Sequence, residues 1–200
     1  MIRNIIFDVG MVLVDFCWEK ALRDLGFTGE TFEAVANATV RSSLWIEVDR
    51  SRMSDRELLA GFIKNAPEQE ANIRLFWDHI EDVIACYPYA NDWVRELKER
   101  GYRCYILSNY GRRLYERTGD KLSFEKLMDG ALFSFLVQQV KPEAQIYETL
   151  LERFELKPEE CIFFDDNLDN VEAARKLGIH GVQFTSREEA EQVLADILKF

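Results

Sequence analysis

The chain has 200 residues, the size of one domain or of one core domain with a modest insertion. Hydrophobic residues make up 48% of it, including 14 Phe and 4 Trp, which is enough for a large core. The net charge is −11 and there is no block of Lys or Arg, so binding to nucleic acid or to an anionic membrane surface is not expected.

The four cysteines, at positions 17, 86, 104 and 161, show neither CxxC pairs nor metal-ligand spacing. Cys104 and Cys161 lie beside apolar runs and are expected to be buried thiols in a reducing compartment. The first 15 residues lack the pattern of a secretory signal, and no apolar run approaches the roughly 18 residues of a membrane span. These features predict a soluble, cytoplasmic protein.

An unbroken apolar run at residues 5–7 leads directly into Asp8. Such a run is typical of a strand that is buried on both faces in a parallel sheet. Asp8 is therefore expected at the carboxyl end of the first strand, where open α/β sheets bind their ligands. Gly10 is expected to allow a tight turn with close backbone approach to a ligand. Taken alone, Asp8 is equally well explained as the cap of a turn or of a helix.

Four helices are predicted between this strand and the next, over residues 16–25, 30–38, 54–63 and 68–85. The third opens with a capping box, in which Ser54 is followed three residues later by Glu57. Because one crossover needs only one helix, we interpret residues 17–87 as an inserted helical cap and residues 1–16 and 88–200 as the core domain. One cap segment is expected either to line a substrate pocket or to be solvated surface: Trp45, Glu47, Arg50 and Arg52.

Strands and helices alternate in the rest of the chain. The predicted strands cover 102–107, 131–137, 161–164 and 181–184, and the predicted helices cover 88–101, 112–128, 142–154, 168–177 and 187–198. This alternation predicts an α/β fold: a doubly wound, parallel, five-stranded Rossmann-like sheet with helices on both faces and the inserted helical cap.

Four of these strands are followed by polar groups that a parallel sheet would bring to one edge: Asp8, Ser108 with Asn109, Lys141, and Asp165 with Asp166. Three carboxylates do not crowd together ionised without a cation. A bound metal is therefore expected, and ligands that are all oxygen favour Mg²⁺ over Zn²⁺.

This set of groups suits phosphoryl transfer, because it supplies positioning and charge neutralisation. Asp8 would attack phosphorus and form an aspartyl-phosphate, which water then hydrolyses. Lys141 would add a positive charge, although by itself it reads as a surface lysine before a helix. Asn170 either supports the site or simply starts a helix.

The motifs resemble those of the haloacid dehalogenase-like (HAD) hydrolase superfamily over the whole chain. They read FDVGMV at 7–12, LSN at 107–109, KPE at 141–143 and FDDNLDN at 164–170. The helical insertion resembles the small cap of subfamily I members. The first and fourth motifs are most similar to those of bacterial sugar-phosphate phosphatases of the α-D-glucose-1-phosphate phosphatase type, which implies a small phosphorylated substrate.

The resemblance also implies roles for single residues. Asp8 would be the nucleophile, and Lys141 would steady Asp8 and the transferring phosphate. Mg²⁺ would be bound by Asp8, by the main-chain carbonyl of Gly10 and by Asp166, with Asp165 helping directly or through water. The phosphoryl group would be held by Ser108 and Asn109.

Gly10 departs from the family pattern, since most phosphatases of the superfamily carry there a second Asp that protonates the leaving group. Dehalogenases also lack it, which leaves a 2-haloacid dehalogenase as an alternative, although such enzymes work without metal and need no acid pair like Asp165 and Asp166. A catalytically weak binding protein with this fold is a third reading. The missing acid matters least for a glycosyl 1-phosphate, whose sugar departs easily. Asp15 is the nearest spare carboxylate, but it lies seven residues from Asp8, so a turn or cap role explains it better than a proton shuttle does.

Overall fold

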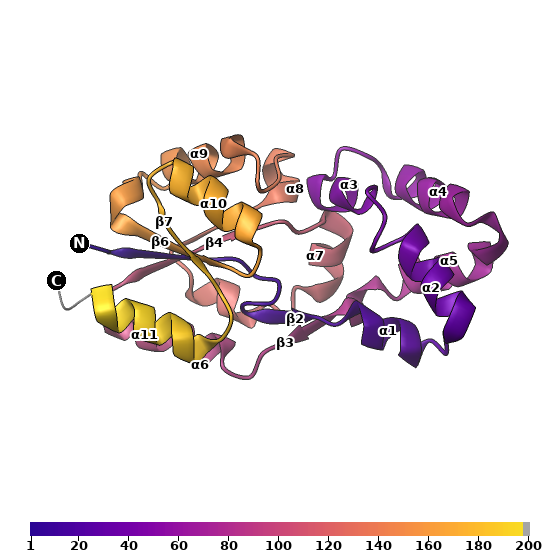
Figure 1. Ribbon diagram of the computed structural model, residues 1–200, viewed down its shortest axis with the longest axis horizontal. Helices are drawn as coiled ribbons and strands as arrows, with labels where there is room; N and C mark the ends of the chain where they lie inside the picture. Colours follow the sequence, from indigo (N-terminus) through magenta and orange to yellow (C-terminus); the bar gives the residue numbers. More distant parts are fainter. Residues whose placement is uncertain (198–200) are drawn as a thin grey trace.

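The structure, a computed structural model, describes residues 1–197 (Figure 1). Its main sheet is five-stranded and parallel, in the order β5-β4-β1-β6-β7, which confirms the predicted fold class. Its strands are β1 (Asn4–Phe7), β4 (Arg103–Ser108), β5 (Gly130–Phe133), β6 (Cys161–Asp165) and β7 (His180–Gln183).

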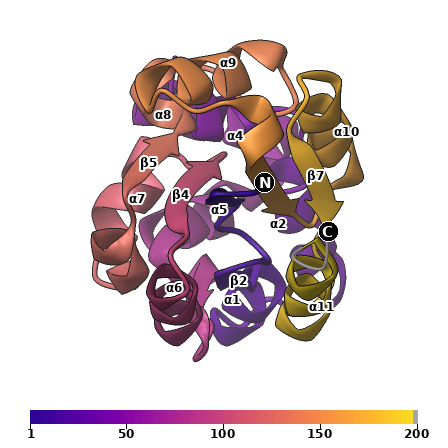
Figure 2. The same ribbon diagram turned by 90° about the vertical axis from the view of Figure 1, so that its left-hand side faces the viewer.

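Helices cover both faces of this sheet (Figures 1 and 2). One face carries α9 (Ala144–Arg153) and α10 (Leu168–Lys176), and the other carries α6 (Ala90–Glu99) and α11 (Arg187–Ile197). Successive strand residues point to opposite cores: Phe164 packs against Trp93 of α6, whereas Phe163 packs against Tyr147 of α9. Burial on both faces explains why these strands read as continuous apolar runs.

The chain between β1 and α6 lies largely beyond the carboxyl ends of the strands (Figure 1). We call the part from α1 to η2 the helical insertion. It consists of α1 (Trp18–Asp24), α2 (Gly29–Ala38), α3 (Trp45–Arg50), α4 (Asp55–Asn65), η1 (Pro67–Gln69), α5 (Glu70–Asp78) and η2 (Ile80–Val83). Its two ends are joined by an antiparallel pair of short strands, β2 (Val14–Phe16) and β3 (Ile84–Cys86). The division into a core of 1–16 and 88–200 and a cap of 17–87 stays a prediction.

The predicted start of α4 is confirmed as a capping box. The Ser54 hydroxyl accepts a hydrogen bond from the Glu57 backbone N–H at 3.3 Å, and the Glu57 carboxylate accepts one from the Ser54 N–H at 2.8 Å. Two donors of the first turn are satisfied in this way.

The predicted helix over 68–85 is wrong at its end. α5 stops at Asp78, a 3₁₀ turn follows, and Ile84 then pairs with Phe16 across the two short strands. The apolar spacing continued through this region, but pairing with a distant strand overrode it. The first helix is shortened for the same reason, because residues up to Phe16 belong to β2.

The predicted strand over 131–137 is also too long, since β5 ends at Phe133 and α8 (Ser134–Val137) follows. An apolar run does not distinguish a strand from a short buried helix. The predicted helix over 112–128 divides into α7 (Arg112–Thr118) and the 3₁₀ helix η3 (Ser123–Leu127).

Helix α3 (Trp45–Arg50) was not predicted. The remaining differences are small. α6 and α9 begin two residues after the prolines predicted to open them, at Ala90 and Ala144, and a 3₁₀ turn, η4 (Pro158–Glu160), precedes β6. The predicted last helix is confirmed as α11 up to Ile197, and residue 198 lies outside the described residues. Within residues 1–197, no helix is both long and apolar enough to cross a membrane.

Candidate active site

The predicted carboxylates meet at the carboxyl edge of the sheet. Asp8 directly follows the central strand β1, and Asp165 is the last residue of its neighbour β6. The Asp8 N–H donates to the Phe164 carbonyl at 2.9 Å, which fixes the two strand ends side by side. Asp8, Asp165 and Asp166 each offer a carboxylate oxygen, and these atoms lie within 4.8 Å of one another.

Lys141 lies between two of these carboxylates. Its Nζ is 2.9 Å from Oδ1 of Asp8 and 2.6 Å from Oδ2 of Asp165, and its side chain is 1% exposed. Burial lowers the Lys141 pKa, but the charges of Asp165 and Asp8 raise it by more, so the pKa lies above its usual value. Lys141 is therefore a buried cation paired on two sides, and the reading as a surface lysine is wrong.

Asp165 is fully buried, and its carboxylate is held by several donors. The Asn170 side-chain amide donates to both carboxylate oxygens at 3.0 Å, and the Asn167 N–H donates to Oδ1 at 2.8 Å. Lys141 Nζ also donates a hydrogen bond to Oδ2. Together these bonds fix the Asp165 carboxylate, which in turn orients the lysine. Asn170 thus supports the site, which was one of its two predicted roles.

Asn109 holds the backbone of Lys141. Its Nδ2 donates to the Lys141 carbonyl at 3.0 Å, and its Oδ1 accepts from the Lys141 N–H at 2.8 Å. These two bonds join the loop after β4 to the segment that carries the lysine. Ser108, the last residue of β4, is 1% exposed, and its hydroxyl helps to lower the Asp8 pKa.

The carboxylates perturb one another. The Asp8 pKa is raised to about 7, because burial and, to a smaller extent, the charge of Asp165 raise it by more than Lys141 and Ser108 lower it. Burial and the neighbouring Asp165 also raise the Asp166 pKa. A divalent cation would offset both effects, and a donor set of carboxylate and carbonyl oxygens fits Mg²⁺.

A cavity of about 300 Å³ opens over Asp8 between the sheet edge and the helical insertion. Its polar wall includes Asp8, Gly10, Asn109, Asp166, Asn167 and Asn170, and its other lining residues are Met11, Phe16, Trp45, Asp49, Ile84, Tyr110 and Leu114. The cap segment singled out in the sequence therefore contributes Trp45 to the cavity. Arg50 instead pairs with both carboxylate oxygens of Glu143, at the start of α9, at 2.8 and 2.9 Å.

Asp49 is a carboxylate of the cavity that was not singled out from the sequence. It lies four residues after Trp45 on α3, so the two side chains share one face of this helix. Burial raises its pKa to about 7, the charge of Asp8 adds to this effect, and Lys141 acts against it. The i,i+4 spacing of an aromatic residue and a carboxylate within the segment 45–52 was the signal available.

The turn after Asp8 differs from expectation in one respect. The left-handed residue is Met11, with φ of 56°, whereas Gly10 does not adopt a positive φ. A Cβ added at Gly10 would meet no atom within 4 Å. Crowding of a Cβ therefore does not explain why this position is glycine.

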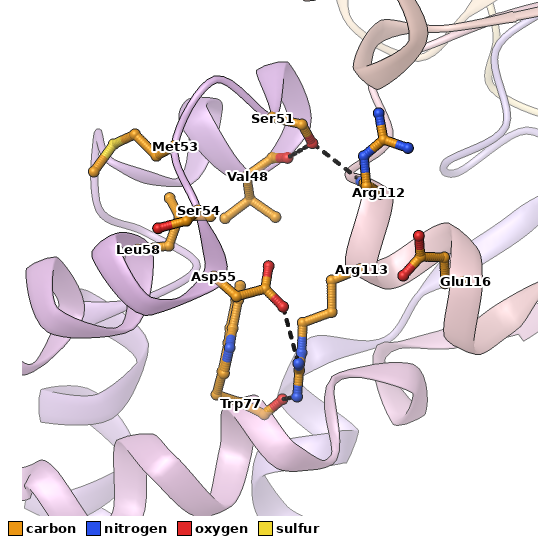
Figure 3. A pocket seen from close by; sticks show the side chains of 10 residues that line it. All are labelled: Val48, Ser51, Met53, Ser54, Asp55, Leu58, Trp77, Arg112, Arg113 and Glu116. Atoms are coloured by element: carbon orange, nitrogen blue, oxygen red, sulfur yellow. Dashed lines mark hydrogen bonds and ion pairs between the residues drawn. The ribbon is translucent and has the colours of Figure 1, made fainter.

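A second cavity, also about 300 Å³, lies between the helical insertion and α7 (Figure 3). Its main charged side chain, Arg113, lies over the Trp77 ring, pairs with Asp55 at 3.0 Å and donates to the Trp77 carbonyl at 3.2 Å. None of the three clustered carboxylates lines it. These contacts dock the insertion on α7, so the catalytic candidates remain in the first cavity.

Comparison with known proteins adds a family to this geometry. A family model described as haloacid dehalogenase-like hydrolase matches residues 2–178. The chain is 24% identical to the drimenol cyclase drtB of Aspergillus calidoustus, of which it spans only 37%. It is 25% identical to the sesquiterpene phosphatase astK of Aspergillus oryzae, with 90% of this chain and 88% of that protein covered. Identity to the phosphorylated carbohydrates phosphatase of Thermotoga maritima is 23%, with 89% and 82% covered.

Two solved structures share the fold. An HAD family enzyme from Bacteroides thetaiotaomicron, in complex with magnesium and inorganic phosphate, matches with a TM-score of 0.72 at 20% identity, covering 94% of this chain and 96% of that one. An L-2-haloacid dehalogenase from Xanthobacter autotrophicus matches with a TM-score of 0.67 at 16% identity, covering 98% and 83%. The family match extends over nearly all of the sheet and the whole helical insertion. The chain belongs to the haloacid dehalogenase-like hydrolases.

Proposed function

We propose that this chain is a Mg²⁺-dependent phosphatase that hydrolyses a small phosphorylated metabolite. The observation that carries the proposal is Lys141, buried between Asp8 and Asp165 in a cluster of three carboxylates. A phosphoryl group entering this cavity would meet a carboxylate nucleophile and a fixed cation together. The names of the phosphatase relatives and the magnesium and phosphate in the related structure support the same reading.

In this proposal Asp8 attacks phosphorus and forms an aspartyl-phosphate, which water then hydrolyses. Lys141 holds the Asp8 carboxylate in place and offsets the charge of the phosphoryl oxygens. Ser108 donates to the phosphoryl group, while the Asn109 side chain contributes through its two bonds to the Lys141 backbone.

The Mg²⁺ ligands would be Asp8, the main-chain carbonyl of Gly10 and Asp166, with Asp165 acting directly or through water. When bound, the ion supplies positive charge beside the phosphoryl oxygens. The Asp165 carboxylate already accepts hydrogen bonds from Lys141, Asn167 and Asn170, which favours an indirect role for it.

The proposed substrate is a sugar phosphate. Trp45 and Phe16, with ring centroids 6.0 Å apart, give the cavity an aromatic wall on which a sugar ring can pack. Residues 17–87 would act as the cap that encloses this part of the substrate. Within the class, a glycosyl 1-phosphate depends least on a general acid, because its sugar departs easily.

The proposed setting is the cytoplasm, supported by four free cysteines, two of them buried. A net charge of −11 supports a small-molecule partner rather than nucleic acid.

The test is a phosphatase screen across phosphorylated metabolites with Mg²⁺ and with EDTA. We expect turnover of sugar phosphates that EDTA abolishes, and none with Asp8→Asn, which keeps the shape of the side chain but removes the nucleophilic carboxylate. Activity that survives in Asp8→Asn would exclude the aspartyl-phosphate. Release of halide from 2-haloacids in EDTA would instead identify a dehalogenase, and binding of Mg²⁺ and phosphate without any turnover would identify a binding protein.

A further inference from the structure

Asp49 brings a fourth carboxylate to the cavity of the nucleophile. Unlike the three clustered carboxylates, it comes from the helical insertion, on α3, and it lines the same 300 Å³ space as Asp8 and Gly10. Asp8 and Lys141 reach this space from the sheet edge and Asp49 reaches it from the insertion, so a leaving group enclosed by the insertion would lie on the side of Asp49.

Two residues outside the helical insertion, Ser134 and Glu143, hold this part of α3 in place. The Ser134 hydroxyl donates to the Asp49 carbonyl at 2.7 Å and also accepts from the Tyr110 N–H at 2.8 Å, in the loop after β4. The next residue, Arg50, donates two hydrogen bonds to the Glu143 carboxylate. Helix α3 is thus tied to the two loops that carry Asn109 and Lys141, so Asp49 is positioned with the catalytic groups.

In the part of the chain that the structure describes, the Asp49 carboxylate has no hydrogen-bond or ion-pair partner. Burial, and secondarily the charge of Asp8, hold its pKa at about 7, which suits a group that gives and takes a proton near neutral pH.

We propose that Asp49 is the general acid and base of this site and replaces the carboxyl that the family pattern places at the position of Gly10. This inference rests on the proposed phosphatase function. It gives the helical insertion a chemical role in addition to enclosing the substrate.

An Asp8 oxygen attacks phosphorus, the bond from phosphorus to the ester oxygen breaks, and that oxygen takes its electron pair and the proton of the Asp49 carboxyl, so an alcohol leaves. A water molecule then attacks the phosphorus of the aspartyl-phosphate and gives its proton to the Asp49 carboxylate. The bond from phosphorus to the Asp8 oxygen breaks, phosphate is released and both residues return to their starting states.

This role also widens the expected substrates. A site without a general acid would be restricted to leaving groups that are stable as anions. With Asp49 as the acid, phosphates of ordinary sugar hydroxyls are within reach as well as glycosyl 1-phosphates.

The test compares two aryl esters of similar shape in the presence of Mg²⁺. p-Nitrophenyl phosphate releases an anion that needs no proton, whereas phenyl phosphate releases a more basic one. Because kcat/KM reports the first chemical step, we expect Asp49→Asn to lower it for phenyl phosphate by about 10²- to 10⁴-fold, the usual range for a lost general acid. For p-nitrophenyl phosphate the fall should be less than tenfold.

Two further variants separate this role from a structural one. Asp15→Asn removes the other spare carboxylate, which lies on β2 and is not among the described residues that line the cavity, and it should leave both esters unaffected. A Cβ at Gly10 would meet no atom within 4 Å, and Gly10 lines the cavity. Gly10→Asp combined with Asp49→Asn should therefore restore phenyl phosphate hydrolysis, because it returns a carboxyl to the cavity.

Equal losses for both esters in Asp49→Asn, or no loss for either, would overturn the role of Asp49 while Asp8→Asn still tests the phosphatase itself. If the wild-type protein hydrolyses no phosphate ester with Mg²⁺, both proposals are overturned.

Discussion

At the scale of single residues, Lys141 shows how the site is held together. A buried ammonium is costly unless it is paired and its geometry is fixed. Asp8 and Asp165 pair with its side chain, and Asn109 fixes its backbone through both the N–H and the carbonyl. The resemblance to the family implies that Asn109 holds the phosphoryl group, whereas these contacts indicate that it holds the lysine.

The two roles of Asn109 predict different effects on stability. Asn109→Ala leaves a buried N–H and a buried carbonyl of Lys141 without their partner, so we expect the free energy of unfolding to fall by about 1–3 kcal/mol. Urea unfolding measures this change. Asn37→Ala, at an exposed position of α2, is the control and should cost much less. If Asn109→Ala unfolds like the wild type, Asn109 does not act through the lysine.

At the scale of elements, the contact between α3 and the loop before α7 positions the cavity wall. A Cβ added at Gly111 would lie 2.7 Å from the Val48 carbonyl oxygen and 2.8 Å from its Cγ1. Only glycine lets the loop after β4 approach α3 this closely. The carbonyl that would be displaced immediately precedes Asp49 in the chain.

Gly111→Ala should therefore push α3 away from the core. We expect a loss of about 1–3 kcal/mol in stability, as for other overpacked contacts, together with a fall in kcat/KM. Gly119→Ala is the matched control, since its Cβ would meet the Tyr115 carbonyl at an ordinary 3.6 Å and its φ of −57° is helical. That change should raise the free energy of unfolding by about 0.4–1 kcal/mol, because alanine lowers the conformational entropy of the unfolded chain. Thermal or urea unfolding measures both changes in stability. If Gly111→Ala is as stable and as active as Gly119→Ala, the close packing of α3 on Gly111 does not position the cavity wall.

The sequence predicted the elements whose signals are local. The parallel strands were marked by continuous apolar runs, and α4 by its capping box at Ser54. The errors occur where a distant partner decides the structure. Ile84 becomes a strand only because Phe16 lies opposite it, and Ser134 starts a helical turn where its hydroxyl bonds to Tyr110 and to Asp49.

In the molecule as a whole, the site is built from residues at the ends of parallel strands and from a residue on the inserted helices. Residues at the ends of parallel strands must meet at one edge, so Asp8, Asp165 and Asp166 were predictable together. The spacing of Trp45 and Asp49 places both on one face of a helix, but no rule of sequence spacing fixes how an inserted group of helices turns toward the sheet, so the meeting of Asp49 with Asp8 was not predictable. The hydrophobic core runs without a break from the sheet into the insertion, and this packing sets that orientation.

The acidic cavity predicts how the stability of the whole protein depends on pH when metal is absent. Burial raises the pKa values of Asp8 and Asp49 from 3.8 to about 7. A carboxyl whose pKa is higher in the folded state stabilises the fold fully below its unfolded pKa, and this contribution is lost as the pH rises through the folded value. In EDTA the Tm should therefore fall between pH 5 and pH 8, and it should fall less in Asp49→Asn, which has one fewer carboxyl to ionise.

Asp15→Asn is the control and should show the same fall in Tm as the wild type. Excess Mg²⁺ should raise the Tm most at pH 8, because cation binding favours the ionised carboxylates. An Asp49→Asn protein that loses as much Tm as the wild type over this range would show that Asp49 does not titrate in the cavity.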